Sequence, residues 1–281
     1  MKPKLRNTLK TKEIIETSIR VMSFNIRWKG CENNEPTEIC WKSRKENVAS
    51  IIRFHKADIL GLQEPTKDQL DELNSLIPEY AYCGQGLEDG ENKDPVNPIL
   101  YLKDRFKLLD NSIFYLSDTP DIPSIGWNAK FLRAVTWAKF KDFKTDEVFY
   151  IFNTHFDYHS KSARDKSAKL LKEKIKEIAN DSSFIVTGDF NIFPNLGGNE
   201  TYKLLTNDNL LIDAHFKSIF PHHGPTGSWS GFKEPGQPGI KPDYIFVSKS
   251  SKVLTHGILA DSFDGNYPSD HLPVIAEIEI K

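Results

Sequence analysis

The chain has 281 residues, of which 38% are hydrophobic and 27% are charged, with 37 lysines and arginines against 39 aspartates and glutamates. This composition excludes a collagen-like or strongly disordered chain and supplies enough apolar surface for a sizeable core. The net charge of −2 argues against a surface built for non-specific nucleic-acid binding, although it leaves room for a local basic groove.

The sequence carries no recognisable targeting segment. No run approaches the ~18 apolar residues of a membrane span, and the basic, polar N-terminus lacks the apolar centre of a secretory signal. The cysteines Cys31, Cys40 and Cys83 are odd in number and have no C-x-x-C spacing, which favours reduced thiols over the alternative of a Cys31–Cys40 bridge. These features predict a cytoplasmic protein.

Strands and amphipathic helices alternate in the first third of the chain. Residues 1–18 are charged and show little periodicity, so we expect a flexible leader followed by a single domain over residues 19–281. Apolar spacing predicts helices over Trp41–Phe54 and Asp68–Ile77. The strands predicted around them are Arg20–Ile26 and Asp58–Leu62.

The rest of the chain is richer in strands. One long helix is predicted over Ser162–Ala179, and its expected buried face carries Leu170, Leu171, Ile175 and Ile178. The Gly- and Pro-rich segment His222–Lys241 is predicted to be a long functional loop. The predicted strands are Pro98–Leu102, Phe106–Leu109, Arg133–Phe140, Val148–Thr154, Phe184–Thr187, Tyr244–Val247 and Val274–Ile280. This pattern favours two sheets packed face to face with helices outside.

Polar side chains stand at the ends of several predicted strands. A site assembled from strand ends is the usual way in which an α/β scaffold holds catalytic groups rigidly. Five segments end a strand in this way, and a sixth begins one: Ser23-Phe24-Asn25, Leu62-Gln63-Glu64, Asn153-Thr154-His155, Thr187-Gly188-Asp189-Phe190-Asn191, Ser269-Asp270-His271 and Pro242-Asp243-Tyr244. Their coincidence predicts a functional site at one end of the sheets.

The acidic and amide residues among them suit metal-assisted hydrolysis. Glu64 is a hard oxygen ligand of the kind that Mg²⁺ and Mn²⁺ prefer. Asp189 could orient or deprotonate a water molecule, and Asn191 could position that water or a phosphate oxygen. Each residue alone has a structural interpretation as well, since an aspartate at a strand end is often a turn former or a helix cap.

The histidines suit the stabilisation of developing negative charge. His271 could donate to a phosphate oxygen in the transition state, with Asp243 or Asp270 fixing its tautomer. His155 offers a second imidazole for charge stabilisation or for protonation of the leaving group, although a lone histidine is more often structural.

Together these segments resemble the motifs of the endonuclease/exonuclease/phosphatase superfamily, the metal-dependent phosphoesterases related to DNase I. The matching segments follow the family's order and span Arg20 to Ile280. They are Ser23-Phe24-Asn25-Ile26-Arg27, Leu62-Gln63-Glu64, Asn153-Thr154-His155, Gly188-Asp189-Phe190-Asn191, Asp243-Tyr244-Ile245 and Ser269-Asp270-His271-Leu272-Pro273. The Trp41-Lys42-Ser43-Arg44 helix and Gly126-Trp127 look like a group of small bacterial members.

The resemblance implies an α/β fold, a four-layered sandwich of two packed mixed β-sheets flanked by helices, with the site at one end. The implied metal group for Mg²⁺ or Mn²⁺ is Glu64, Asn25 and Asp270. The implied catalytic group is Asp189, Asn191, His155, His271 and Asp243. Arg133 and Asn25 would contact the substrate phosphate, and Trp127 and Trp229, with Trp28 and Phe232, are candidates for stacking on the substrate.

The chain also departs from the patterns of particular branches. Glu64-Pro65-Thr66 stands where apurinic endonucleases usually have Gln-Glu-Thr-Lys, which argues against base-excision repair. The small bacterial group commonly has a Gly-Arg-Asp-Asp-Gly run where this chain has Gly84–Gly90, and Arg-Ile-Asp where Lys241-Pro242-Asp243 stands. Neither departure removes a primary catalytic residue.

We therefore expect a Mg²⁺- or Mn²⁺-dependent enzyme that hydrolyses phosphodiester bonds in a nucleic-acid or nucleotide-type substrate by attack of an activated water. The alternatives are a phosphomonoesterase, a phospholipid- or sphingomyelin-type phosphodiesterase, and a catalytically silent binding domain. No obligate protein partner is inferred. Zinc is not called for, because the sequence has no Cys₂His₂ spacing.

Overall fold

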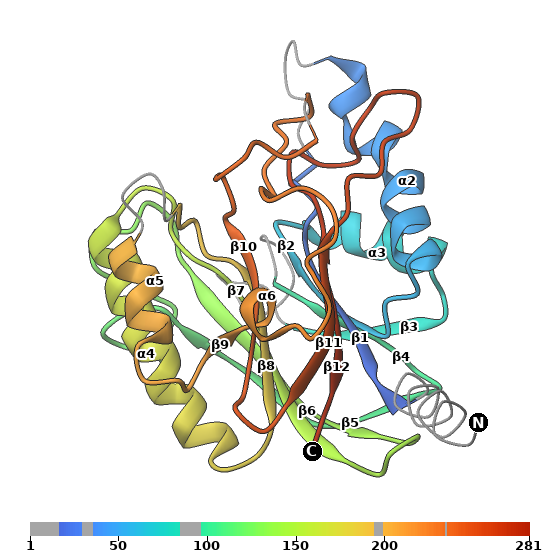
Figure 1. The fold of residues 1–281 in the computed structure, drawn as a ribbon. Coiled ribbons are helices and arrows are strands. Elements are labelled where there is room, and N and C mark those ends of the chain that lie inside the picture. Colours follow the sequence, from blue (N-terminus) through green and yellow to red (C-terminus); the bar gives the residue numbers. More distant parts are fainter. Residues whose placement is uncertain (1–16, 30–35, 85–96, 194–198, 234) are drawn as a thin grey trace, which may run out of the picture.

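Two six-stranded mixed β-sheets pack face to face in the computed structural model, which describes residues 17–29, 36–84, 97–193, 199–233 and 235–281 (Figure 1). Sheet A has the strand order β11 (Lys252–Ile258), β12 (Val274–Glu279), β1 (Ile19–Asn25), β2 (Ile59–Gln63), β4 (Ile99–Leu102) and β3 (Tyr80–Cys83). Sheet B has the order β5 (Phe106–Tyr115), β6 (Ala134–Asp142), β7 (Val148–His155), β8 (Phe184–Asp189), β10 (Asp243–Val247) and β9 (Ile212–Asp213).

Helices cover the outer faces of both sheets, so the predicted four-layered α/β sandwich is confirmed. Sheet A packs against α2 (Trp41–Phe54) and α3 (Lys67–Leu76). Sheet B packs against α4 (Lys161–Ala179) and α5 (Asn199–Thr206). The remaining short helices are η1 (Thr37–Ile39) and α6 (Ala214–Lys217).

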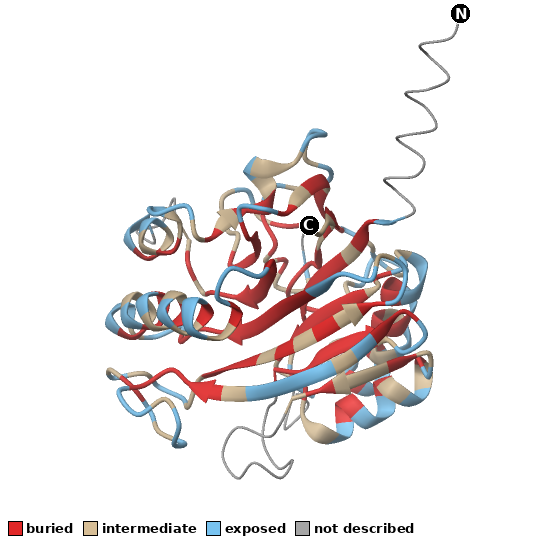
Figure 2. Cartoon of the chain, turned by 90° about the horizontal axis from the view of Figure 1, so that it is seen from below, coloured by how far each residue is buried: buried red, intermediate tan, exposed pale blue. Residues whose placement is uncertain are grey.

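Each sheet is buried on both faces, which explains the nearly continuous apolar runs of its central strands. In β1, the side chain of Val21 packs between the sheets, whereas Met22 and Phe24 pack beneath α2 and α3. Figure 2 shows buried residues along the strands and exposed residues on the outer sides of the helices. The rigid centre of the molecule therefore carries the strand ends at which the polar motifs stand.

The predicted helices and strands are present, and several differ in extent. The strand predicted over Phe106–Leu109 continues to Tyr115, because β5 is an edge strand and the polar residues 110–112 face solvent. In α4, Leu171 and Ile175 are buried as predicted, whereas Leu170 and Ile178 are half-buried. The elements β3, β9, β11, η1, α5 and α6 were not predicted.

Several predictions fall wholly or partly on residues that the structure does not describe. Of the predicted leader over residues 1–18, only Thr17 and Ser18 are described, and of the Gly84–Gly90 departure only Gly84. The described residues of His222–Lys241 form the predicted long loop, with no helix or strand beyond isolated bridges. No helix in the described ranges is long and apolar enough to cross a membrane.

The prediction of reduced cysteines is wrong for Cys40. That residue is disulfide-bonded, whereas Cys83 is a buried free thiol. The physical reason is simple: an odd number of cysteines is compatible with one bridge and one unpaired thiol, so the count alone does not report oxidation. The cysteines therefore give no support to the predicted cytoplasmic location.

Candidate active site

Strand pairing brings the polar motifs of each sheet to the same end. In sheet A, β1 and β2 run parallel, and Asn25 lies opposite Gln63, the residue before Glu64. In sheet B, β7 and β8 run parallel, and His155 lies opposite Asp189. The antiparallel β10 begins there, so that Asp243 also lies opposite Asp189.

A buried amide joins the two sheets just behind these residues. The Nδ2 atom of Asn153, on β7, donates to the carbonyl oxygens of Leu62 (2.8 Å) and Pro98 (3.0 Å) of the sheet A segments. Its Oδ1 accepts from Nε2 of Gln63 at 2.7 Å. The sheets are so close here that a Cβ atom added to Gly61 would lie only 2.4 Å from Asn153 Oδ1. Hydrogen bonds thus fix the spacing between the two sheets next to the candidate site.

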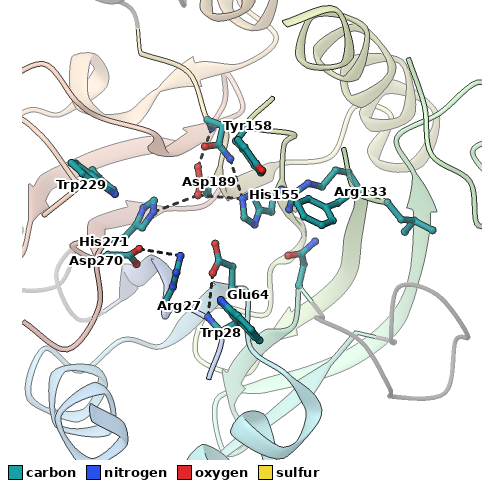
Figure 3. Close-up of a pocket in the computed structure, with 14 residues that line it drawn as sticks. Arg27, Trp28, Glu64, Arg133, His155, Tyr158, Asp189, Trp229, Asp270 and His271 are labelled. Atoms are coloured by element: carbon teal, nitrogen blue, oxygen red, sulfur yellow. Dashed lines mark hydrogen bonds and ion pairs between the residues drawn. The ribbon is translucent and has the colours of Figure 1, made fainter. Parts of the chain in front are cut away.

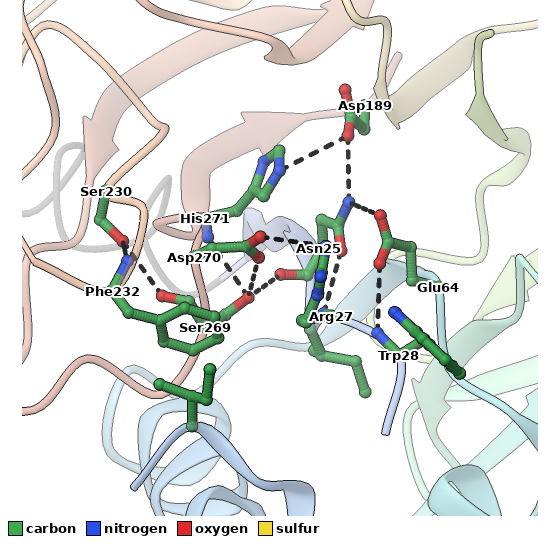
Figure 4. Close-up of polar contacts among 12 residues, drawn as sticks. Asn25, Arg27, Trp28, Glu64, Asp189, Ser230, Phe232, Ser269, Asp270 and His271 are labelled. Carbon is green, nitrogen blue, oxygen red and sulfur yellow. Dashed lines mark hydrogen bonds and ion pairs between the residues drawn. The ribbon is translucent and has the colours of Figure 1, made fainter. Parts of the chain in front are cut away.

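Two carboxylates from different sheets share one amide group (Figure 4). Nδ2 of Asn25 donates to Oε1 of Glu64 and to Oδ2 of Asp189, both at 3.0 Å. The other Glu64 oxygen, Oε2, accepts from the backbone N–H of Trp28 at 3.1 Å. Glu64 has a φ of +69°, an uncommon conformation for a non-glycine residue that is often found at functional sites. The amide of Asn25 therefore holds the carboxylate groups of Glu64 and Asp189 close together.

His271 is held by a buried carboxylate. Its Nδ1 lies 2.9 Å from Oδ2 of Asp243, and the same oxygen accepts from the hydroxyl of Ser228 at 2.6 Å. Its Nε2 lies 3.8 Å from Oδ2 of Asp189. Burial alone would lower the pKa of His271, but the carboxylates of Asp243 and Asp189 raise it well above its usual range. His271 is therefore an imidazolium that presents Nε2–H to the cavity.

His155, unlike His271, carries no charge. Burial, together with the positive charges of Arg133 and His271, lowers its pKa well below the usual range, so the ring is neutral. Its Nε2 lies 3.0 Å from Nδ2 of Asn191, and that amide also donates to the carbonyl oxygen of Phe156 at 3.0 Å. The neutral ring accepts from Asn191 through Nε2. The site thus combines one charged and one neutral imidazole.

Burial also changes the acidity of the central aspartate. It raises the pKa of Asp189 to about 7, with Asp243 raising it further, while His271 and the Asn25 amide oppose the shift. The backbone N–H of Asn191 donates to Asp189 Oδ1 at 3.0 Å. A carboxyl group with a pKa near neutrality is suited to accept a proton from water.

A cavity of about 670 Å³ is lined by Glu64, His155, Asp189, Asn191 and His271, whereas Asn25 and Asp243 lie behind its wall (Figure 3). The aromatic side chains on its walls are Trp28, Phe131, Tyr158 and Trp229. Phe131, Tyr158 and Arg27 were not predicted as site residues. Trp127 does not line the cavity: its indole N–H donates to Asp118 Oδ1 at 2.7 Å, and its ring packs against the core beneath α4. Phe232 does not line it either.

Two arginines add positive charge to the cavity. Arg133 is largely buried, its Nε has no hydrogen-bond partner in the described residues, and its contact with Asp157 is long at 3.9 Å. Burial lowers the pKa of Arg133 below its usual value, while Asp157 and Asp189 raise it. Arg27 pairs with Asp270 at 3.5 Å. Burial raises the pKa of Asp270, which lines the cavity and makes no hydrogen bond with the ring of His271.

Arg44 positions two loops of the site from behind. Its side chain is fully buried and donates to the carbonyl oxygens of Ile26 (2.6 Å) and Pro268 (2.8 Å). It also donates to the carbonyl oxygens of Arg27 (3.1 Å) and Trp28 (3.2 Å). The arginine of the Trp-x-x-Arg helix therefore ties the loop after β1 to the segment that carries Asp270 and His271.

The donor groups of the cavity fit a divalent cation. Glu64, His155 and Asp189 each offer one ligand atom, and these atoms lie within 4.8 Å of one another. Two carboxylates that face one another in a buried site repel without a counter-charge. Carboxylate oxygens with room for water are the ligands that Mg²⁺ and Mn²⁺ prefer.

Comparisons with known proteins agree with this architecture. Residues 22–271 match the model of the Endonuclease/Exonuclease/phosphatase family. An uncharacterized protein of Acanthamoeba polyphaga mimivirus is 31% identical over 293 residues, covering 93% of this chain and 100% of that protein.

Solved structures from bacteria are similar over nearly the whole chain. A mannosyl-6-phosphatase of Bacteroides thetaiotaomicron is 32% identical, with a TM-score of 0.86, covering 94% of this chain and 100% of that one. An endonuclease/exonuclease/phosphatase protein of Bacteroides vulgatus is 35% identical, with the same TM-score and coverage. The human Nocturnin catalytic domain, 22% identical with a TM-score of 0.71 over 95% and 94% of the two chains, shares the fold.

Proposed function

Because the chain belongs to the endonuclease/exonuclease/phosphatase family, we propose that it is a divalent-metal-dependent phosphoesterase that hydrolyses its substrate by attack of an activated water. The observation that carries the proposal is the convergence of Glu64, Asp189, one charged imidazole and one neutral imidazole on one cavity. A catalytically silent binding domain would not require two carboxylates together with a charged and a neutral imidazole.

The metal group would consist of Glu64 and Asp189, with Asn25 orienting both carboxylates and Asp270 nearby. A bound Mg²⁺ or Mn²⁺ ion would supply Lewis-acid polarisation of the phosphate and neutralise developing charge. Arg133 would bind a phosphate oxygen, because its buried guanidinium lacks a close anionic partner.

The side chains would divide the proton chemistry among them. Asp189 would accept a proton from the attacking water, and Asn191 would orient that water or the phosphate beside His155. His271 would donate from Nε2 to a phosphoryl oxygen as negative charge increases in the transition state. Asp243 would hold the orientation and the positive charge of the His271 ring through the 2.9 Å contact at Nδ1.

The substrate class has two candidates, each favoured by one observation. Phosphodiester cleavage of a nucleotide-type substrate, expected from the sequence, agrees with an aromatic-lined cavity in which Trp28, Tyr158 and Trp229 can stack on a base. Hydrolysis of a sugar phosphomonoester is favoured by the 32% identity to a mannosyl-6-phosphatase. Both need the same phosphate-binding and water-activating residues.

Initial rates on a substrate panel in the presence and absence of a chelator test the proposal. The panel contains single-stranded RNA and DNA, dinucleotides, nucleotide monoesters, hexose 6-phosphates, inositol phosphates and sphingomyelin. We expect Mg²⁺- or Mn²⁺-dependent turnover on a phosphate ester, reduced by about 10²–10⁴ in Asp189→Asn. Turnover that survives the chelator, or an Asp189→Asn variant with normal turnover, would contradict the proposed chemistry.

A further inference from the structure

Three histidines form a second cluster of metal-binding side chains outside the cavity. His215 lies in α6, His222 in the loop that follows, and His256 in β11. One ring nitrogen from each lies within 4.8 Å of those from the other two. The ring centroids are 4.7 to 5.1 Å apart. None of the three lines the cavity described above.

The hydrogen bonds of His222 identify which of its nitrogens carries the lone pair that could bind a metal. Its Nε2 lies 2.8 Å from the carbonyl oxygen of Pro225, which can only accept, so Nε2 carries a proton. In the neutral ring Nδ1 then carries a lone pair, which accepts a hydrogen bond from Nδ1 of His256 at 2.9 Å, and a bound metal would replace that bond. Metal-binding histidines usually donate their other ring N–H to a carbonyl or carboxylate in this way.

The other two rings contain buried nitrogens without partners. In the described part of the chain, Nδ1 of His215 and Nε2 of His256 have no hydrogen-bond partner, although both atoms are inaccessible to solvent. Buried polar atoms in native proteins are rarely left unpaired, because each costs free energy. A ligand held by the cluster would remove this deficit.

The charge state of the cluster suits a cation. Burial, with help from Lys241 and the neighbouring rings, lowers the pKa of His256 to about 2. Burial also lowers the pKa of His215. Lys241 opposes positive charge at the cluster, and Asp213, whose Oδ2 lies 3.6 Å from the Lys241 ammonium, opposes this effect at His215. Neutral imidazole is the form in which histidine binds metal.

We propose that His215, His222 and His256 bind one Zn²⁺ ion, with water in the fourth position. Zn²⁺ binds imidazole nitrogen at about 2.0–2.1 Å in a tetrahedral arrangement, which places ligand atoms roughly 3.3 Å apart. The half-buried rings of His215 and His222 can turn by the small amount that this requires, while β11 holds His256. Mg²⁺ does not fit the cluster, because it prefers oxygen ligands.

The ion would join α6 and the following loop to the edge strand of sheet A. Backbone hydrogen bonds already link them, among them one from the His223 N–H to the carbonyl oxygen of His256 at 3.0 Å. The same loop continues to Ser228, whose hydroxyl donates to Asp243. Zinc would therefore stabilise the loop that supports the Asp243–His271 pair.

Zinc retention in the Glu64→Gln protein tests the site, because that substitution weakens metal binding in the cavity. The chelator-stripped protein is given Zn²⁺ with excess Mg²⁺, separated by gel filtration and analysed for zinc. We expect about one zinc per chain and a rise in Tm of roughly 5 °C at a hundredfold excess of Zn²⁺ over Kd. Adding His215→Gln together with His222→Gln should abolish both effects. Adding His223→Gln, an exposed neighbour outside the cluster, should abolish neither.

X-ray absorption at the zinc edge of the Glu64→Gln protein gives a second measurement that needs no histidine variant. Three imidazole ligands are expected. The proposal is overturned if the parent protein retains no zinc, if zinc persists in the double histidine variant, or if the absorption spectrum shows fewer than three imidazoles.

Discussion

Removal of the charge beside His271 should reduce turnover without disrupting the fold. Asp243→Asn keeps the size of the side chain but removes the carboxylate that lies 2.9 Å from Nδ1 of His271. With charge centres about 4 Å apart and an effective dielectric constant of about 20, the pair is worth about 4 kcal/mol. If the transition state loses that interaction, kcat falls by about 10³.

The pH dependence distinguishes this mechanism from general damage. The Asp243 carboxylate raises the pKa of His271, so in Asp243→Asn that pKa falls and the ring loses its proton at lower pH. The alkaline limb of the kcat profile should therefore move to lower pH. Hydrolysis of bis(4-nitrophenyl) phosphate with Mg²⁺ or Mn²⁺, quenched at fixed pH, measures this shift.

A matched control and a double variant complete the test. Asp142→Asn makes the same change at a buried aspartate that pairs with Arg105 at 2.9 Å, so it should lower stability but leave the pH profile unchanged. Adding Asp243→Asn to His271→Gln should cost little more than His271→Gln alone, because the two residues act as a unit. Losses that multiply in the double variant would refute the pairing.

Three further outcomes follow from the geometry. Glu64→Gln should lose most of the Mg²⁺-induced rise in Tm, measured by calorimetry, while the metal-free protein melts no lower; an unchanged Mg²⁺ affinity would exclude Glu64 as the principal ligand. Arg44→Met should lower the free energy of unfolding in urea by about 2–4 kcal/mol, because it leaves several buried carbonyl oxygens without a donor. Burial raises the pKa of Cys83 from 9.0 to about 12, so the folded chain keeps a proton that the unfolded chain releases above pH 9. Stability should fall with rising pH above 9 by roughly 1 kcal/mol per unit from this residue, and Cys83→Ala should lessen that slope in urea titrations at pH 8 and 10.

Several parts of the site that the sequence predicted are attached to regular strands. Asn25, Glu64, His155 and Asp189 follow apolar runs that could form only buried strands, and parallel pairing brings such ends together. The cavity walls were harder to predict. Phe131 and Tyr158 come from loops, whose paths depend on tertiary contacts that local patterns do not encode.

Two other features of the structure could not be predicted from local sequence patterns. Trp127 was expected to face the substrate, but its indole N–H donates a hydrogen bond to Asp118 instead. Nothing in the Gly-Trp dipeptide indicates that bond. The histidine cluster joins His222 to His256, 34 positions along the chain, so no metal-binding spacing was visible. Both depend on contacts between segments that only the folded chain brings together.

The bridge made by Asn153 has a consequence for cation choice. Glu64 stands on one sheet and Asp189 on the other, so the span between their oxygens is set by the gap that Asn153 and Gly61 hold narrow. Mg²⁺ demands near-ideal octahedral geometry at 2.0–2.1 Å, whereas Ca²⁺ tolerates longer and more irregular coordination. A substitution that widens the gap between the sheets at Gly61 would then alter the preference between these ions. The preference for Mg²⁺ over Ca²⁺ would therefore report the separation of the two sheets.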